Sequence, residues 1–236
     1  MRLRKILVWG GALVVVLLAG WAGVEAFVIW ANLYQAEKES RLFYLPAFAL
    51  TTDRTPIDFT MRGFVFRIPK AYLTFTHQWE GGPVQEIFLQ ALLPKLEPPT
   101  EHNLDDFKKT GWVDEITISI TDAELINDPE FVDSLYLGEI KPETRSKSNH
   151  SLLRYEFYHS GGDELYIPAA RHPQLRYFTC AIGDKFVVYP SCNGSFYLNS
   201  KLYIEYSYGK QHLGEWQDVH RQVVSLVSEF IASEPN

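Results

Sequence analysis

The sequence predicts an α+β domain that follows an N-terminal transmembrane helix. Three features of the 236-residue chain predict it: an apolar run over residues 6–30, several short segments rich in β-branched and aromatic residues, and a long amphipathic helix at the C-terminus. The short segments are joined by brief connections containing Gly, Pro and Asn, which favour antiparallel pairing. We therefore expect an antiparallel sheet with helices packed on one face.

The N-terminal run is long enough to cross a bilayer as a helix. Residues 6–24 contain no charged side chain and would form roughly 28 Å of helix, which matches the hydrocarbon core. Basic residues in the first five positions place the N-terminus in the cytoplasm. A signal peptide cleaved near residues 24–26 is the alternative, but the apolar run continues to Trp30 and favours an uncleaved anchor.

These features divide the chain into four parts. Residues 1–5 form a cytoplasmic tip, residues 6–30 a signal-anchor helix in the lipid bilayer, and residues 31–41 a linker. Residues 42–236 form the α+β domain outside the cytoplasm. The arrangement predicts a single-pass membrane protein.

The clearest strand pattern lies in residues 115–121, where Ile alternates with Thr and Ser. Residues 63–69 also alternate and stop at Pro69, whereas residues 84–93 are apolar on both faces, as in a buried strand. Further strands are expected at residues 152–159, 164–167, 175–182, 185–189, 195–198 and 202–208.

The C-terminal helix should lie on the sheet, because its apolar residues recur at spacings of three and four. This stripe consists of Leu213, Trp216, Val219, Val223, Leu226 and Phe230. Shorter surface helices are expected at residues 101–109 and 128–137. In the second of these, Asp128 is a good N-cap and Pro129 suits the first helical position.

Cys180 and Cys192 are the two cysteines of the chain and are consistent with one disulfide in an oxidising compartment. If Gly183-Asp184 formed a two-residue hairpin turn, Cys192 would lie opposite Leu175, about 17 Å along the strand from Cys180. That separation exceeds disulfide reach, so a bond requires the chain to bend back after Pro190. We favour the disulfide over two separate buried thiols or a metal site.

No motif in the sequence predicts a metal, cofactor or catalytic site. The seven His residues lack the spacing of known metal sets, and His212 and His220 are expected in solvated or capping roles. Ser160 lies near His159 and Asp163, but a catalytic triad is assembled in space, and a turn between two strands explains these residues better. We therefore assign no catalytic residue and no cofactor, and favour a protein that is not an enzyme.

The negative charge is concentrated in one segment. The chain has a net charge of −7, but Glu97 to Glu143 holds 13 acidic and three basic residues, a net charge of −10. This acidity argues against nucleic-acid binding. The segment is either a solubilising surface, an acidic surface that steers a basic protein partner, or a weak divalent-cation site. The candidate protein-binding residues are Asp105, Asp106, Asp114, Glu115, Asp122, Glu124, Asp128, Glu130 and Asp133.

Several segments resemble uncharacterised single-span inner-membrane proteins of Gram-negative bacteria that carry a periplasmic domain. The resemblance lies in residues 66–73 (FRIPKAYL), Gly81-Gly82 and residues 91–98 (ALLPKLEP), and extends to residues 180–192 and the C-terminal helix. Some members of this group are suspected immunity or partner proteins of secreted toxins. The resemblance implies a periplasmic location for residues 42–236 and supplies no catalytic residues.

The favoured function is a membrane-anchored periplasmic protein that binds another protein, such as a toxin, through the acidic surface in residues 97–143. Two alternatives stay open. One is an envelope hydrolase with a nucleophile near Ser160 and a distant His77 or His172. The other is a structural component of an envelope assembly.

Overall fold

The computed structural model describes residues 50–108, 113–126, 136–148, 150–158, 163–183, 187–198 and 201–234. The chain divides into two compact units, residues 1–48 and 49–236, and the described residues belong to the second. The predicted anchor over residues 6–30 and the predicted linker over residues 31–41 lie outside the described residues. Within the described ranges, no helix is long and apolar enough to cross a membrane.

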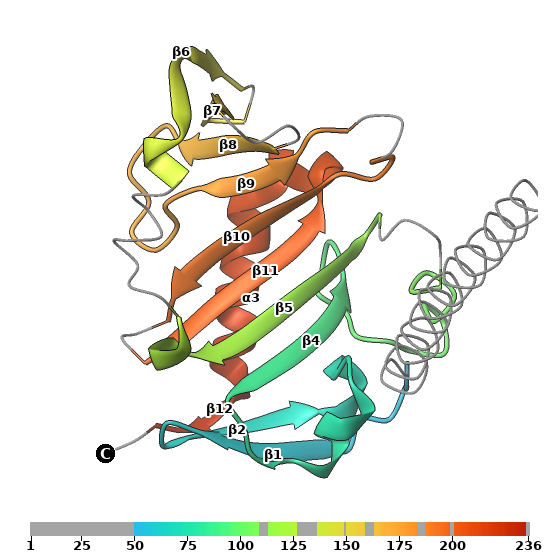
Figure 1. The fold of residues 1–236 in the computed structure, drawn as a ribbon. Helices are drawn as coiled ribbons and strands as arrows, with labels where there is room; N and C mark the ends of the chain where they lie inside the picture. The colour runs from blue at the N-terminus through green and yellow to red at the C-terminus, as the bar shows by residue number, and fades with distance from the viewer. Residues whose placement is uncertain are drawn as a thin grey trace, which may run out of the picture. The chain divides into compact units, whose positions relative to one another are not determined.

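The second unit is built around an eight-stranded sheet (Figure 1). Its strand order is β4-β5-β11-β10-β9-β8-β7-β6, and every neighbouring pair is antiparallel, as the sequence predicts. The strands are β4 (Glu86–Leu92), β5 (Glu115–Asp122), β6 (Ile140–Lys147), β7 (Leu152–Phe157), β8 (Asp163–Pro168), β9 (Phe178–Ala181), β10 (Ser191–Tyr197) and β11 (Leu202–Gly209).

The strand predicted at residues 63–69 is confirmed as β2, which belongs to a second, four-stranded sheet that the sequence did not predict, in the order β12-β2-β1-β3. Its strands are β1 (Pro56–Met61), β2 (Phe64–Pro69), β3 (Gly82–Pro83) and β12 (Ile231–Ser233). Arg62 and Gly63 both have positive φ angles and form the tight turn between β1 and β2, a geometry that matches the twist of a hairpin. The pairing of β12 with β2 brings the C-terminal strand beside an early one.

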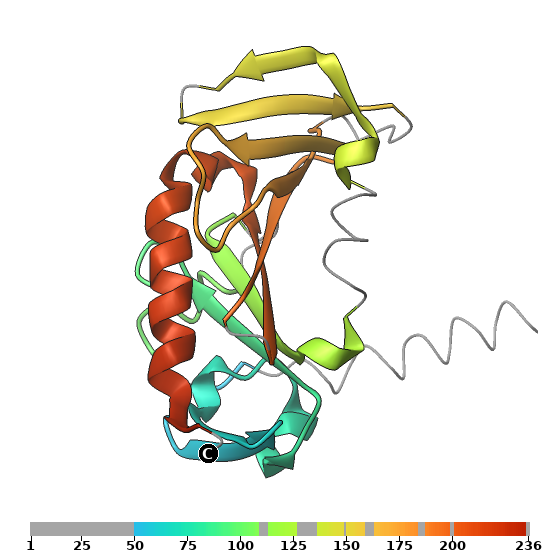
Figure 2. The same cartoon turned by 90° about the vertical axis from the view of Figure 1, so that its left-hand side faces the viewer.

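The helix α3 (Trp216–Phe230) covers one face of the larger sheet (Figure 2). The predicted apolar stripe is confirmed with small changes. Leu213 is buried in the preceding 3-10 helix, Leu226 is partly buried, and Val227 joins the buried side. The described 3-10 helices are η1 (Lys70–Tyr72), η2 (Thr76–Glu80), η3 (Ala123–Leu125) and η4 (Lys210–Glu215). Burial of each Val or Phe on the sheet contributes about 1.5–3 kcal/mol.

The prediction of a helix at residues 101–109 is wrong for the described part of that range, because residues 101–108 form turns. The backbone N–H of Thr100 donates to Asn103 Oδ1 at 2.6 Å, and the backbone N–H of Asn103 donates to Thr100 Oγ1 at 3.2 Å. Such side-chain bonds compete with helical hydrogen bonds. The helix predicted at residues 128–137 lies outside the described residues except for its end, where residues 136–138 are helical.

The structure confirms a disulfide between Cys180 and Cys192, and the strand pairing differs from the register that a two-residue turn at residues 183–184 would impose. The two cysteines lie directly opposite each other on β9 and β10, with Cα atoms 4.0 Å apart. Between these strands, the described residues 182–183 and 187–190 lie outside any strand, so the described part of the strand predicted at 185–189 is not formed. The backbone N–H of Lys210 donates to the Pro190 carbonyl at 2.8 Å, which fixes the end of this loop.

Glu164 on β8 is a buried carboxylate with three hydrogen-bond donors. Arg154 Nε donates at 2.7 Å, Lys210 Nζ at 2.6 Å and the Tyr166 hydroxyl at 2.7 Å. Burial alone would raise the pKa of Glu164, but the bonds from Arg154, Lys210 and Tyr166 outweigh it and lower the pKa to about 2. The cluster joins β7, β8 and η4, and so holds the start of α3 on the sheet.

Replacing Glu164 with Gln should strongly destabilise the protein, because Arg154 and Lys210 would keep their charges beside a neutral partner. We expect a loss of about 3–5 kcal/mol in the free energy of unfolding, measured by urea denaturation of the full chain at pH 7. In the wild type, the contribution of Glu164 should be present above about pH 4.5 and disappear as the pH falls towards 2. The control is Glu156→Gln, which removes a half-exposed partner of Arg154 at 3.5 Å. Equal losses in the two variants would contradict this assignment.

Candidate functional site

Several loops lie at the same end of the larger sheet. Antiparallel pairing places the last residues of β4, β9 and β11 beside the first residues of β5, β8 and β10, as the pairs Leu92↔Glu115, Ala181↔Asp163 and Gly209↔Ser191 show. These strand ends lie on the right in Figure 1. We call this part of the surface the loop end; its described loop residues are 93–108, 113–114, 158, 182–183 and 187–190.

Exposed apolar side chains are concentrated at the loop end. Val188 is 65% exposed and Tyr189 is 54% exposed, and both lie in the loop that the disulfide closes. Ile182 and Val187 are exposed in the same loop, and Tyr158 is exposed at the end of β7. These five account for most of the eight large apolar side chains exposed among the described residues. A cluster of this kind is typical of an interaction surface, whereas isolated exposed apolar residues are common.

Acidic residues also lie at the loop end. Asp105 and Asp106 are exposed, and Asp105 forms an ion pair with Lys108 at 3.0 Å. Asp114 is exposed and lies 2.9 Å from His212 Nε2. Glu115 differs from these, because it is half-buried and burial raises its pKa to about 7. Near neutral pH, Glu115 therefore carries a full negative charge only part of the time.

The other predicted acidic residues do not share this location. Asp122 and Glu124 lie at the opposite end of β5, roughly 24 Å along the strand from Glu115. Both form ion pairs with Arg62, the pair to Asp122 at 3.4 Å. The remaining three, Asp128, Glu130 and Asp133, lie outside the described residues. The described acidic residues therefore form two separate groups, and their role in binding stays a prediction.

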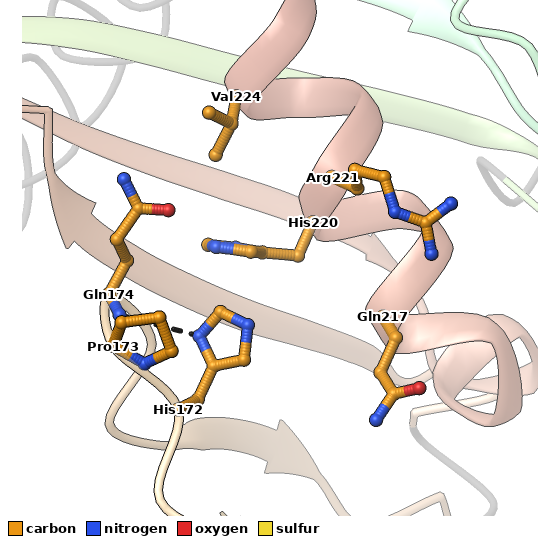
Figure 3. Close-up of a pocket in the computed structure, with 7 residues that line it drawn as sticks. All are labelled: His172, Pro173, Gln174, Gln217, His220, Arg221 and Val224. Carbon is orange, nitrogen blue, oxygen red and sulfur yellow. Dashed lines mark hydrogen bonds between the residues drawn. The ribbon is translucent and has the colours of Figure 1, made fainter.

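A second candidate site is a cavity of about 320 Å³ between α3 and the loop that precedes β9 (Figure 3). Its lining residues are His172, Pro173, Gln174, Gln217, His220, Arg221 and Val224. His172 Nδ1 accepts the backbone N–H of Leu175 at 3.0 Å, which fixes its ring. The rings of His172 and His220 are nearly perpendicular, with centroids 4.9 Å apart.

His220 is buried, so its predicted solvated or capping role is wrong. Only 3% of the residue is exposed, and its Nδ1 lies 3.0 Å from the Tyr206 hydroxyl. Burial, assisted by nearby His172, lowers the pKa of His220 to about 4, so the ring is neutral at pH 7. Its spacing of four residues from Trp216 and three from Val223 is the signal that could have placed it on the buried face of the helix.

The structure does not test the predicted hydrolase site, because Ser160 lies outside the described residues. His77 is exposed in η2 and stacks on Phe75 with ring centroids 5.4 Å apart, whereas His172 lies in the cavity beside α3. Among the described residues, no group of three or more His, Cys, Asp or Glu side chains could hold a metal ion.

Comparison with known proteins shows what this fold resembles. No family model and no curated protein matches the chain. The fold is similar to Smlt3025, an immunity protein of the Stenotrophomonas maltophilia type IV secretion system, with a TM-score of 0.53 and 16% identity over 76% of this chain and 94% of that one. It is also similar to the Neisseria meningitidis iron-regulated outer membrane lipoprotein FrpD, with a TM-score of 0.51 and 17% identity over 79% of this chain and 97% of that one. These likenesses show a shared fold.

Replacing Glu115 with Gln should stabilise the protein at alkaline pH. The pKa of Glu115 is raised in the folded state, so its contribution is favourable below about pH 4.5 and is lost as the pH rises through about 7. We expect Glu115→Gln to raise Tm of the full chain at pH 8 and to change it little at pH 4.5. The control is Glu97→Gln, an exposed carboxylate near Lys95, which should show no such difference between the two pH values. A Glu115→Gln protein with a lower Tm at pH 8 would contradict the burial argument.

Proposed function

We propose that this chain is a non-enzymatic periplasmic protein, anchored in the inner membrane by residues 6–30, that binds and neutralises a protein toxin. The observation that carries the proposal is the exposed apolar cluster at the loop end, centred on Val188 and Tyr189 in the disulfide-closed loop. The fold likeness to an immunity protein of a secretion system supports the same role. The two cysteines suit an oxidising compartment such as the periplasm.

The chemistry of the loop end suggests the kind of partner. Specific protein interfaces commonly combine a desolvated apolar centre with a polar rim, and tyrosine is enriched among the residues that dominate binding energy. Val188 and Tyr189 would form the centre, and Asp105 and Asp106 would form part of the rim. A toxin with an apolar contact patch bordered by basic residues would complement both parts.

Two features would help the loop to bind without a large ordering cost. The disulfide joins the strands at the base of the loop, and the bond from the Lys210 N–H to the Pro190 carbonyl fixes the last loop residue before β10. A loop held in this way loses less conformational freedom on association than an open one. The apolar side chains would therefore be presented in a restricted set of positions.

Substituting the apolar centre should abolish protection against the toxin. In the source bacterium, a strain lacking this gene should be outcompeted by its parent during growth in contact, and a plasmid copy of the wild-type gene should restore its survival. The double variant Val188→Asp/Tyr189→Asp should fail to restore it, because loss of a central contact costs about 2 kcal/mol or more in binding. Survival is measured as the ratio of the two strains after mixed growth.

The matched control for this test is Leu125→Asp. Leu125 has the same 54% exposure as Tyr189 but lies in η3, at the opposite end of β5. This variant should protect as well as the wild type, and equal abundance of the two variants in the membrane fraction shows that both fold. Full protection by the double variant would contradict docking at the loop end, and a deletion strain with no disadvantage would contradict the immunity role.

Reversing charge on the rim should weaken protection by slowing association. We expect the Asp105→Lys/Asp106→Lys variant to need several-fold more protein than the wild type for the same survival, because opposite charges accelerate encounter. Survival is measured against the induced level of each protein. The control is Asp218→Lys on α3, because Asp218 pairs with Arg221 three residues away, as Asp105 pairs with Lys108. Identical curves of survival against protein level for the rim variant and the wild type would contradict the electrostatic part of the proposal. They would not contradict docking through the apolar side chains.

A further inference from the structure

The cavity beside α3 adjoins a second cavity of about 550 Å³, and the two share His172 and Pro173. Arg221 lines the first cavity, and Arg171 and Arg176 line the second. No carboxylate is among the described residues that line either cavity. In a chain with a net charge of −7, three arginines around adjoining cavities form a local region of positive charge. Such a region favours an anionic ligand.

The hydrogen bond between Tyr206 and His220 determines where the His220 ring carries its proton. Tyr206 is 1% exposed, and burial keeps the pKa of its phenol well above the usual range, so the hydroxyl retains its hydrogen. This buried hydrogen needs an acceptor, and His220 Nδ1 lies 3.0 Å from the hydroxyl oxygen. A neutral ring that accepts at Nδ1 carries its hydrogen on Nε2. His220 Nε2 is therefore an N–H donor.

This donor is buried and has no hydrogen-bond partner among the described residues. Figure 3 shows the ring of His220 extending from α3 into the space between the helix and the loop that carries Gln174. Burying a polar donor without an acceptor is unfavourable, so a group with an acceptor oxygen in the cavity would remove that cost. The buried Nε2–H group of His220 therefore indicates a ligand, and this indication is independent of the three arginines.

His172 contributes in a similar way. Its Nδ1 accepts the backbone N–H groups of Gln174 at 3.4 Å and Leu175 at 3.0 Å, so a neutral ring carries its hydrogen on Nε2. Burial lowers the pKa of His172, which favours the neutral form. Two neutral imidazoles and a permanently charged guanidinium, Arg221, therefore border one cavity.

We propose that the cavity between α3 and residues 171–175 binds a small anion through carboxylate or phosphate oxygens, with His220 Nε2–H as its buried donor and Arg221 as a positive charge at its edge. Arg221 donates to Asp218 at 2.7 Å in an exposed pair, and in Figure 3 its guanidinium extends away from the tip of the His220 ring, so it acts on the site as a nearby positive charge. Residues 171–175 follow the end of β8, whereas the loop end lies at its start. The anion site is therefore separate from the proposed toxin-docking surface.

The test is titration of the full chain in detergent with sodium phosphate and, separately, with sodium acetate and sodium malonate. Sodium chloride keeps the ionic strength constant. Binding is followed by NMR of the histidine side-chain nitrogens and by calorimetry. We expect the His220 Nε2 resonance to move in a saturable manner with phosphate or with a carboxylate, and the arm that saturates identifies the class of anion. A His220 signal that does not move in any arm, or that moves equally with chloride, would overturn the proposal.

Variants separate the anion site from general charge effects. Arg221→Gln should weaken binding at least fivefold, because it removes the positive charge at the edge of the cavity from an exposed position on α3. The matched control is Arg67→Gln on β2, an exposed arginine that pairs with Asp58 at 2.9 Å, and it should bind like the wild type. Equal weakening in both variants, or none in Arg221→Gln, would contradict the site. His220→Gln, which keeps polar groups near Tyr206, should lose binding while the chain stays folded; unchanged affinity in this variant would also count against it.

Discussion

Unbroken antiparallel pairing from β4 to β6 is the constraint on which the rest of this structure depends. Because each strand reverses direction relative to its neighbour, loops that are remote in the sequence meet at the same end of the sheet. The acidic loop after β4 and the apolar loop after β9 share one end for this reason. The disulfide and the Glu164 cluster then stabilise β8, β9 and η4 beside one another. The proposed docking surface is thus a consequence of strand direction as much as of local sequence.

Where α3 covers the larger sheet, the constraint is the burial of side chains and not the direction of the strands. The interface is mainly apolar, yet Tyr206 and His220 place two polar groups inside it. Their mutual hydrogen bond satisfies the phenol and one ring nitrogen, but the second ring nitrogen is left at the cavity wall. Apolar residues of similar size would avoid the cost of burying that donor. An anion that accepts a hydrogen bond from the second ring nitrogen of His220 would remove this cost. The proposed anion site therefore explains why a polar pair occupies this position.

The sequence predicted the strands and the helix whose apolar residues recur at a regular spacing. The alternation in residues 115–121 and the apolar stripe on α3 gave the central strand and the helix, because each pattern reports one buried face. The small sheet could not be predicted in this way, since β12 is short and its partner β2 lies more than 160 residues earlier. Likewise, a count of acidic residues along the chain contains no information about strand ends, so it could not separate Asp114 from Asp122.

The proposed docking residues lie in loops and not in the strands and helix that define the fold. Two solved structures have folds similar to this chain at only 16% and 17% identity, so a similar fold is compatible with mostly different side chains. Under the proposed function, binding specificity would come from side chains that packing leaves free to vary, and such side chains are found in loops. In this chain Val188 and Tyr189 fit that description, because they are exposed, lie outside the strands and lie between two strands that a disulfide joins.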